Sequence, residues 1–461
     1  MYTNIKLKLS FIFLALVFIM TSAFGCKSTV SQEAKEKIQP ITLNYWRVWD
    51  GQEAFEDIVA AYRALHPNIN IDYRKLRYEE YEKELVDSFA EDRGPDIFSV
   101  NAGWLRRYQG KIAPLPEETT MAYSVVTGTI QKQETVSLRT SPSLTAKQLK
   151  ENYVDVVADN AIIDDKIYGL PLSVDTMVLF YNRDLLNSAG ITEVPRYWNE
   201  QFLSDVKKLT KQDKDGKIVQ SGVALGTAEN VERYSDILSL IMMQNGAEMM
   251  TPEGVVSFHR LPAGASDKNY VPGLEALRFY TDFANPVKEV YAWNKDLPNS
   301  LEAFIDGRLA FFFGYSYHLP QIQARAPRLN FGISAMPQIE GNPKAVNFAN
   351  FWLETTSSKS KYQNEAWDFI QFVTKAENVK SYLTAAQRPT ALRALINEQT
   401  NDENLAVFAN QLLTARTWYK GNDYNAAEVI LGDMIDQALV DAKQMPKLME
   451  TAARKIQQTI Q

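Results

Sequence analysis

The chain contains very little cysteine and histidine for its length. Its 461 residues include one cysteine and three histidines. A single thiol cannot form an intramolecular disulfide bond. The histidines, His66, His259 and His318, are far apart and lack the HExxH spacing of a zinc site. We therefore expect no metal site and no resident cofactor, and we expect each histidine to be a packing or surface residue.

The sequence also lacks the motifs of common hydrolases and nucleotide-binding folds. It has no GxSxG elbow, no Walker loop and no GxGxxG turn. Its net charge of −7 argues against a nucleic-acid partner, because binding to phosphates relies on clusters of lysine and arginine. Carboxyl groups are common, and a glycosidase needs only two facing acids, so a glycan-cleaving enzyme stays an alternative.

Only one long apolar run is present, and it stands near the start of the chain. Lys6 and Lys8 precede the run FIFLALVFIM, and small residues follow it just before Cys26. The run is too short to cross a bilayer comfortably, so this layout predicts a signal peptide over residues 1–25. The stretch AFGC resembles a bacterial lipobox, which implies that Cys26 is lipidated. The alternative is an ordinary signal peptide with an incidental cysteine.

A lipidated Cys26 would anchor the protein to the outside of the cell membrane. Several acyl chains together give stable attachment. Residues 26–40 are polar and uneven, and we expect them to form the tether between lipid and folded body. The folded part is then expected to work outside the cytoplasm, with no further membrane-spanning segment.

The remaining chain is expected to fold as two α/β lobes, because about 435 residues exceed one comfortable core. In residues 41–100, predicted strands with alternating apolar residues (ITLNYW, NINIDYR) alternate with predicted amphipathic helices. This order predicts a right-handed unit of parallel strands and helices. Residues 116–152 interrupt the pattern and are expected to be a surface insertion. Asp215-Gly216 predicts the turn of a hairpin.

Several stretches, taken in order, resemble one family. They are YWRVWDGQEAF, GPDIFSVNAGWLRRY, KIAPL, DKIYGLPLSVDTMVLFYNRDLLNSAGI, GVALGTAENV, EAFIDGRLAFFFGYS and NEAWDFIQFV. Together they resemble the family-1 extracellular solute-binding proteins, the maltose-binding-like receptors of ABC importers, over nearly all of residues 41–440. The resemblance implies an α/β, two-lobed periplasmic-binding-protein-like (type II) fold with interlobe hinge strands. It places the N-terminal lobe at 41–173 and 336–385, and the C-terminal lobe at 176–330 and 390–461.

Strand ends provide the first candidate site residues. In open α/β sheets, ligands bind beyond the carboxyl ends of the strands. For the first strand that end runs from Trp46 to Asp50, and for the strand DIFSV it runs from Asn101 to Trp104. Aromatic faces beside carboxylate and amide groups suit a sugar. Two alternatives stay open, since Trp46 could be a core residue of its strand and Asp50 could only cap the following helix.

The second set of candidates lies further along the chain. The resemblance implies that Asp175, on the first interlobe strand, points into the cleft; the alternative is a carboxylate solvated at the hinge surface. It also implies that Trp418 stacks on a sugar, with a core position as the alternative. Asn230, near a predicted helix start, would cap that helix or contact ligand. Tyr315 ends a strand, and we expect its ring to be exposed for stacking.

Other residues bear on the identity of the ligand. Trp352 and Trp293 are weaker aromatic candidates, while Trp367 is expected in a helix core. The chain departs from the best-known family members in residues 116–152 and in lacking a basic residue beside Asp50. Because Arg233 and Arg388 could bind phosphate, a phosphate-bearing ligand stays an alternative. An iron ligand would need clustered tyrosine and histidine, and the sequence shows no such cluster.

The leading hypothesis is a lipid-anchored, monomeric receptor without catalytic activity. It would capture a mono- or oligosaccharide between its lobes and deliver it to the permease subunits of an ABC importer. Two alternatives remain. One is a cell-surface glycan-active enzyme with two cleft carboxylates, and the other is a surface interaction protein with no role in transport.

Overall fold

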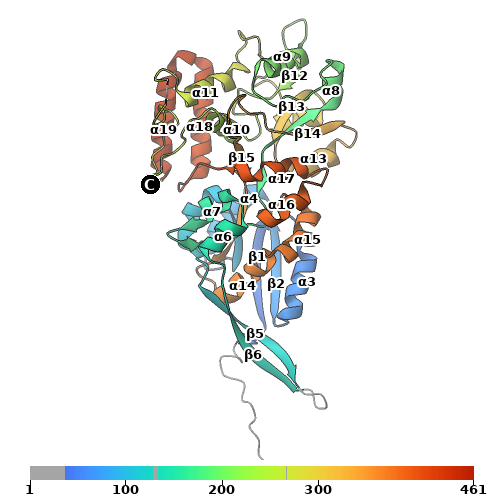
Figure 1. The fold of residues 1–461 in the computed structure, drawn as a ribbon, viewed down its shortest axis with the longest axis vertical. Coiled ribbons are helices and arrows are strands. Elements are labelled where there is room, and N and C mark those ends of the chain that lie inside the picture. Colours follow the sequence, from blue (N-terminus) through green and yellow to red (C-terminus); the bar gives the residue numbers. More distant parts are fainter. Residues whose placement is uncertain (1–36, 128–132, 266, 461) are drawn as a thin grey trace, which may run out of the picture.

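Two lobes lie one above the other along the long axis of the molecule (Figure 1). The structure, a computed structural model, describes residues 37–127, 133–265 and 267–460. The expected signal peptide, Cys26 and most of the tether fall outside these residues. Within the described ranges, no helix is both long and apolar enough to cross a membrane.

The first lobe is built on a five-stranded sheet of order β2-β1-β3-β16-β4. β1 pairs in parallel with both β2 and β3, which confirms the predicted parallel unit. β16 comes from far along the chain and runs antiparallel between β3 and β4. Its elements are β1 (Ile41–Val48), α3 (Glu56–Leu65), β2 (Ile69–Leu76), α4 (Tyr78–Ala90), β3 (Ile97–Asn101), α5 (Leu105–Tyr108), β4 (Ile112–Ala113), α6 (Ala146–Asn152), α7 (Asp155–Ala161), β7 (Ile162–Ile163), β8 (Lys166–Ile167), β16 (Trp352–Ser357), α14 (Gln363–Val373), α15 (Ala376–Ala386) and α16 (Arg393–Gln399).

A two-stranded arm projects from the far end of this lobe (Figure 1). It consists of β5 (Glu118–Thr127) and β6 (Gln133–Pro142), paired antiparallel along their length. Asn364 of α14 holds the base of the arm, because its side chain accepts a hydrogen bond from the Thr120 amide at 2.8 Å and donates one to the Thr120 carbonyl at 2.9 Å. The expected insertion of residues 116–152 therefore contains an ordered ribbon that sequence patterning did not predict.

The second lobe is built on a sheet of order β11-β12-β13-β10-β14. β13 is wholly buried, in keeping with its continuous apolar sequence LAFFFG. β11 and β12 form the predicted hairpin, with Gly216 at a φ of 80° in its turn. The elements are β10 (Val178–Asn182), α8 (Arg183–Ser188), α9 (Glu200–Leu209), β11 (Lys211–Gln212), β12 (Ile218–Val223), α10 (Tyr234–Gln244), α11 (Pro272–Asp282), α12 (Ser300–Ile305), β13 (Leu309–Gly314), α13 (His318–Arg325), β14 (Phe331–Ala335), α18 (Tyr424–Val440) and α19 (Met445–Ile460).

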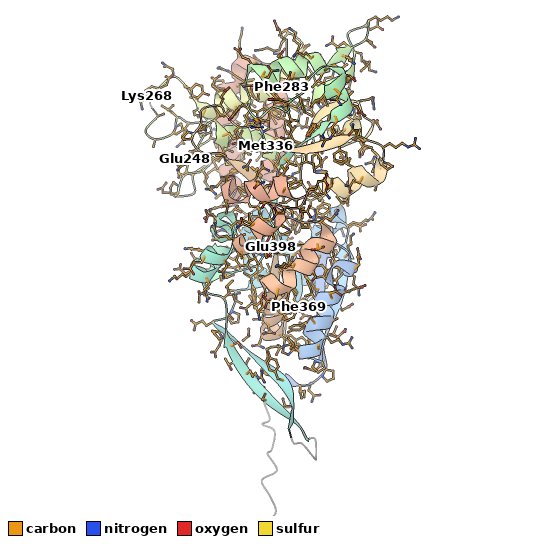
Figure 2. The ribbon with its side chains drawn as sticks, turned by 45° about the vertical axis from the view of Figure 1, so that its right-hand side comes forward. Glu248, Lys268, Phe283, Met336, Phe369 and Glu398 are labelled. Carbon is orange, nitrogen blue, oxygen red and sulfur yellow. The ribbon has the colours of Figure 1, made fainter. Side chains whose placement is uncertain are left out.

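Each lobe has its own hydrophobic core, and the chain crosses between the cores three times. Figure 2 shows Phe369 in the lower lobe and Phe283 in the upper one. The crossings lie in a small sheet of order β17-β15-β9, made of β9 (Asp175–Thr176), β15 (Asn347–Asn350) and β17 (Ala415–Arg416), with α17 (Ala406–Gln411) beside it. These strands are the interlobe hinge strands of the expected fold.

The packing differs from the expected lobe boundaries at the second and third crossings. Met336 and Phe348 pack in the core of the second lobe, because the preceding strand β14 pairs with β10. Leu395 and Ile396 of α16 pack in the core of the first lobe. The chain therefore returns to the first lobe after residue 348. The third crossing lies between residues 396 and 418, where α17 packs on both cores, so both crossings come later than the sequence suggested.

Candidate functional site

A cavity of about 460 Å³ lies between the lobes. Its volume is within the range of small-molecule sites. Residues from both lobes and from the hinge line it: Arg47, Trp49, Asp50, Tyr78, Glu79, Asn101, Trp104, Ser173, Asp175, Glu232, Arg233, Leu301, Tyr317, His318, Gln321, Asn350, Phe351, Trp352, Tyr382, Arg388 and Tyr424.

The carboxyl ends of β1 and β3 bring the first group of lining residues together. Asp50 follows β1 by two residues, and Asn101 is the last residue of β3. Asn101 accepts a hydrogen bond from the Gly103 amide at 3.0 Å and so fixes the short turn that carries Trp104. Parallel neighbouring strands end at the same edge of a sheet, which is why these residues share one cavity.

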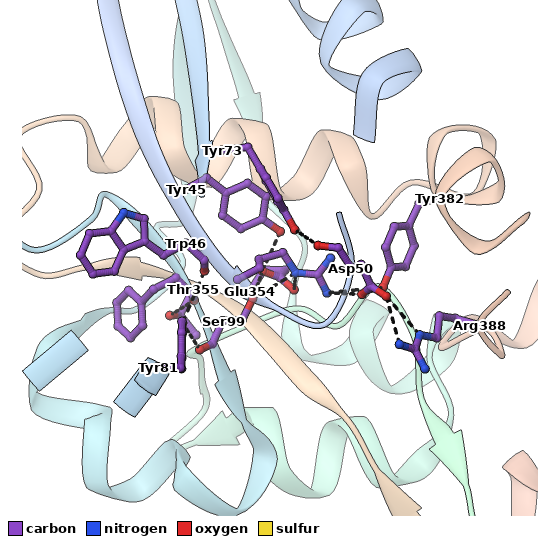
Figure 3. Close-up of polar contacts among 12 residues, drawn as sticks. Tyr45, Trp46, Asp50, Tyr73, Tyr81, Ser99, Glu354, Thr355, Tyr382 and Arg388 are labelled. Carbon is purple, nitrogen blue, oxygen red and sulfur yellow. Dashed lines mark hydrogen bonds and ion pairs between the residues drawn. The ribbon is translucent and has the colours of Figure 1, made fainter. Parts of the chain in front are cut away.

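Asp50 is the centre of a charged network (Figure 3). Its Oδ1 accepts a hydrogen bond from Arg388 Nη2 at 3.0 Å, and its Oδ2 accepts one from the Tyr382 hydroxyl at 2.8 Å. Arg47 Nη2 lies 3.6 Å from Oδ2. Burial acts to raise the pKa of Asp50, but the charges of Arg388 and Arg47 outweigh it, so the pKa is lowered. Asp50 therefore stays ionised, and two basic residues lie beside it that sequence adjacency did not reveal.

A buried ion pair supports this network from beneath. Arg47 Nε lies 3.2 Å from Glu354 Oε1, and both side chains are almost wholly buried. Glu354 Oε2 accepts hydrogen bonds from the Tyr45 hydroxyl at 2.7 Å and the Ser99 hydroxyl at 2.6 Å. Glu354 reaches this position because β16 pairs with β3, which sets Glu354 opposite Ser99.

Asp175 links the hinge to the second lobe. Its carboxylate accepts hydrogen bonds from the Ser316 amide at 2.9 Å and from the Ser316 hydroxyl at 2.6 Å. The same hydroxyl accepts a hydrogen bond from Arg388 Nη1 at 3.3 Å. Burial raises the pKa of Asp175 to about 6, although Arg388 and the Ser316 donors act in the other direction. Arg388 thus bonds a first-lobe carboxylate and a second-lobe hydroxyl at once.

A row of five aromatic rings crosses from one lobe to the other, and we call it the aromatic row. Trp104, Tyr78 and Trp49 of the first lobe stack in turn, with ring centroids 6.2 Å and 5.1 Å apart. Trp49 then stacks on Tyr317 of the second lobe at 5.4 Å, and Tyr317 stacks on Tyr315 at 5.7 Å. Adjacent planes differ by 13° to 23°. Flat faces of this kind cover the C–H faces of sugar rings.

Trp49 takes its place in this row at a conformational cost. Its φ is 70°, in the left-handed region that bulky residues avoid. Such strain costs about 1–3 kcal/mol and is found mainly at functional sites. It turns the indole, 37% exposed, towards the second lobe directly after β1.

A second charged group faces the cavity from the second lobe. Arg233 pairs with Asp236 at 2.9 Å and with Glu428 at 2.9 Å. Glu232 lies next to it with its Oε1 3.9 Å from His318 Nε2. His318 is buried, which lowers its pKa and favours the neutral imidazole. The interaction with His318 is the largest cause of a lowered pKa for Glu232, which therefore stays ionised.

Four of the predicted site residues, Asp50, Asn101, Trp104 and Asp175, line this cavity. The carboxylates of Asp50 and Asp175 are already engaged by protein donors. Asp50 is not the cap of the helix that follows, whose N-cap is Gly51 without a side-chain hydrogen bond, and Asp175 is buried rather than solvated at the hinge surface.

The other four predicted residues do not line it. Trp46 is 9% exposed, and the Arg74 guanidinium covers its ring at 4.7 Å. Tyr315 is fully buried rather than exposed, because its hydroxyl donates to Asp236 at 2.7 Å. Each was expected at a strand end, but each side chain points into protein rather than into the cavity.

Asn230 and Trp418 are likewise occupied by structural contacts. Asn230 donates to the carbonyls of Asn294 and Leu297, at 2.9 Å and 2.8 Å, and so organises a loop of the second lobe. Trp418 is 7% exposed, and its Nε1 donates to the Ser239 hydroxyl at 3.0 Å. For Trp418 the core position is therefore the one observed. Trp367 is also in a core, as expected.

Sequence reasoning missed most of the residues that give the cavity its aromatic and basic character. Trp49 lies within the stretch Trp46 to Asp50, so its strand-end position was an available signal. Tyr78 and Tyr317 carried the same signal, because they follow the ends of β2 and β13 by two and three residues, but each also begins a helix and was not singled out. Arg388 was noted only as a possible phosphate contact, and Trp352 only as a weak candidate.

Comparisons with known proteins agree with this architecture. The family model of bacterial extracellular solute-binding proteins matches residues 49–380. The galactooligosaccharide-binding protein of Bacillus subtilis is 21% identical over 84% of this chain and 81% of its own length. The maltodextrin-binding protein MdxE of the same species is 21% identical over 82% and 85%.

Solved structures show the same two-lobed fold. The cyclic alpha-maltosyl-1,6-maltose binding protein of Arthrobacter globiformis is similar with a TM-score of 0.69 and 16% identity, covering 91% of this chain and 99% of that one. The maltotriose binding protein of Thermus thermophilus, bound with maltotriose, gives a TM-score of 0.64 and 16% identity, covering 91% and 100%. At these identities the likeness establishes the fold.

Proposed function

This chain belongs to the family of bacterial extracellular solute-binding proteins, and we propose that it is a monomeric, lipid-anchored receptor for a mono- or oligosaccharide. It captures the sugar between its lobes and delivers it to the permease subunits of an ABC importer. The observation that carries the proposal is the interlobe cavity, which aromatic rings line from both sides. The names of the relatives, which bind galactooligosaccharides and maltodextrins, support a carbohydrate ligand.

The test is binding without turnover. Titration calorimetry with mono- and oligosaccharides should give one site per chain, and mass spectrometry should find the sugar unchanged after long incubation. X-ray scattering with and without ligand should show a monomer whose radius of gyration changes on binding. Cleaved product would favour the glycan-active enzyme. Absence of binding by every sugar would favour the surface interaction protein.

The lipid anchor is proposed on the sequence around Cys26 and on the position of Lys37, just before β1. Lys37 lies at the start of β1, where its Nζ pairs with Glu365 at 3.3 Å and its carbonyl accepts a hydrogen bond from Asn68 at 3.0 Å. The cavity lies at the opposite end of β1. A membrane anchor on this side would therefore leave the cavity free.

Replacing Cys26 by Ser should release the protein from the membrane fraction without changing sugar affinity. The fold should be intact, because residue 26 precedes both cores. A Cys26→Ser variant that still sediments with membranes at high salt would contradict the anchor.

A further inference from the structure

We propose that the interlobe cavity selects its saccharide by charge, binding sugars that carry a basic amine more tightly than neutral ones and rejecting acidic ones. The inference rests on the proposed function, because it names the substrate class of the same site. The evidence for the inference is the pairing of the charged groups in the cavity: some have a partner of opposite charge within the protein, and others do not.

The arginines of the cavity are committed to protein carboxylates. Each guanidinium group has at least one carboxylate partner within 3.2 Å, and all of these carboxylates belong to the chain itself. A ligand carboxylate or phosphate would have to displace such a partner and leave it buried without its cation, which is strongly unfavourable. The pairs are Arg47 with Glu354, Arg388 with Asp50, and Arg233 with Asp236 and Glu428.

Two carboxylates that line the cavity form no ion pair with a lysine or arginine among the described residues. Glu79 has no ion-pair partner among the described residues and faces the cavity from the start of α4. Glu232 faces it from the second lobe. Its Oε2 accepts a hydrogen bond from Asn299 at 3.1 Å, but the nearest ring nitrogen, of a neutral His318, is 3.9 Å from its Oε1. That distance is too long for a hydrogen bond.

Both of these carboxylates line the same cavity as most of the aromatic row. Glu79 follows Tyr78 directly in the sequence. The His318 ring next to Glu232 packs against Tyr317, with ring centroids 4.2 Å apart. An ammonium group is attracted both by carboxylates and by the faces of aromatic rings, and it gains most where water is excluded. The rings of the aromatic row stack on one another, so the preference for a positive ligand charge rests on the two carboxylates.

The remaining polar groups do not reverse this balance. Arg47 Nη1 has no hydrogen-bond partner within the described residues, but the atom is buried and out of reach of a ligand in the cavity. The charge of Arg47 is neutralised by Glu354 and Asp50. Asp175 adds negative charge when it is ionised.

The experiment compares di- to tetrasaccharides that share a backbone and differ in one group: a hydroxyl, a free amine or a carboxylate. Calorimetry at neutral pH and low salt should give the tightest binding for the amine form and the weakest for the acid. One partly exposed charge pair corresponds to about fivefold in affinity. The preference for the amine should shrink at high salt, because salt screens exposed charges.

Two variants assign the effect to the carboxylates. Glu79→Gln and Glu232→Gln should each reduce the ratio of amine to neutral affinity by about fivefold. Glu80→Gln is the matched control, because Glu80 is exposed, pairs with Arg77 and does not line the cavity. It should leave the ratio unchanged.

The outcomes separate the two proposals. Acidic sugars that bind as tightly as neutral ones, or neutral sugars that bind as tightly as the amine forms, overturn selection by charge and leave the receptor function standing. A ratio that is the same in wild type and both glutamine variants also overturns it. Absence of binding by all three forms overturns the receptor function and this inference together.

Discussion

At the scale of single residues, Arg388 is the side chain whose polar contacts join the lobes across the cavity. It bonds Asp50 at 3.0 Å and Ser316 at 3.3 Å, and 13% of its side chain is exposed. Arg388→Met should lower the free energy of unfolding in urea by about 3 kcal/mol, because it leaves the Asp50 carboxylate buried with only the more distant Arg47.

Arg393→Met is the control for this experiment. Arg393 pairs with Asp155, and this pair is much more exposed. Its loss should cost less than about 1 kcal/mol. Equal losses in the two variants would contradict the role of Arg388 in the network. A double variant with Asp50→Asn should recover part of the stability that Arg388→Met loses, because the unpaired charge is then gone.

Asp175 gives a prediction about pH. Its pKa in the folded protein is raised to about 6, first by burial, whereas an unfolded Asp titrates near 3.9. The folded state therefore holds the proton more tightly, and this contribution to stability is fully present below about pH 4 and is lost as pH rises through 6. Between about pH 4 and a pH above 6, the free energy of unfolding of wild type should fall by on the order of 2–3 kcal/mol relative to that of Asp175→Asn. Urea unfolding at several pH values measures this difference, and parallel curves would contradict it.

Half of the residues predicted from the sequence line the cavity, and the reason is positional. Asp50, Asn101 and Trp104 were found because strand ends meet at one edge of a sheet. Tyr317 and Arg388 were not, because their place depends on how the second lobe and a late segment return to that edge. Tyr315 failed because a strand end fixes where the backbone lies but not which way the side chain points.

At the scale of elements, the arm of β5 and β6 should be dispensable for ligand binding. It projects from the end of the first lobe away from the cavity, and its base is held by Asn364. A variant with residues 122–138 replaced by a short glycine-serine turn should bind sugar with unchanged affinity, measured by calorimetry. If the shortened variant has an unchanged circular-dichroism spectrum but binds sugar more weakly, the arm contributes to ligand binding and the prediction is wrong.

The elements of each sheet were easier to predict from sequence than their division between lobes. The parallel order of β1, β2 and β3 follows from local alternation and short connections. The second crossing was placed too early because β14 looks like any apolar strand, and only its pairing with β10 assigns it to the second lobe. The arm was missed because its threonine-rich and serine-rich sequence is typical of a surface loop as well as of an exposed ribbon.

At the scale of the whole molecule, Gly103 sets how closely the lobes approach. A Cβ built on Gly103 of the first lobe would lie 2.8 Å from the ring of Tyr424 in the second. Gly103→Ala should therefore hold the lobes apart, increase the radius of gyration of the ligand-bound form and weaken sugar binding by about tenfold, as overpacking costs about 1–3 kcal/mol. X-ray scattering and calorimetry measure the two effects.

Gly110→Ala is the control for closure, because a Cβ there meets nothing within 4 Å. It should bind and close like wild type. If both alanine variants behave alike, the contact between Gly103 and Tyr424 does not limit closure.

The three crossings also affect how the protein is made. β16 lies between β3 and β4 in the first sheet, yet it is synthesised some 240 residues after them. The second core requires α18 and α19, which are made later still. Contacts this distant in sequence form slowly, because a long loop must close first. A nascent chain would therefore complete neither core until most of it has been synthesised.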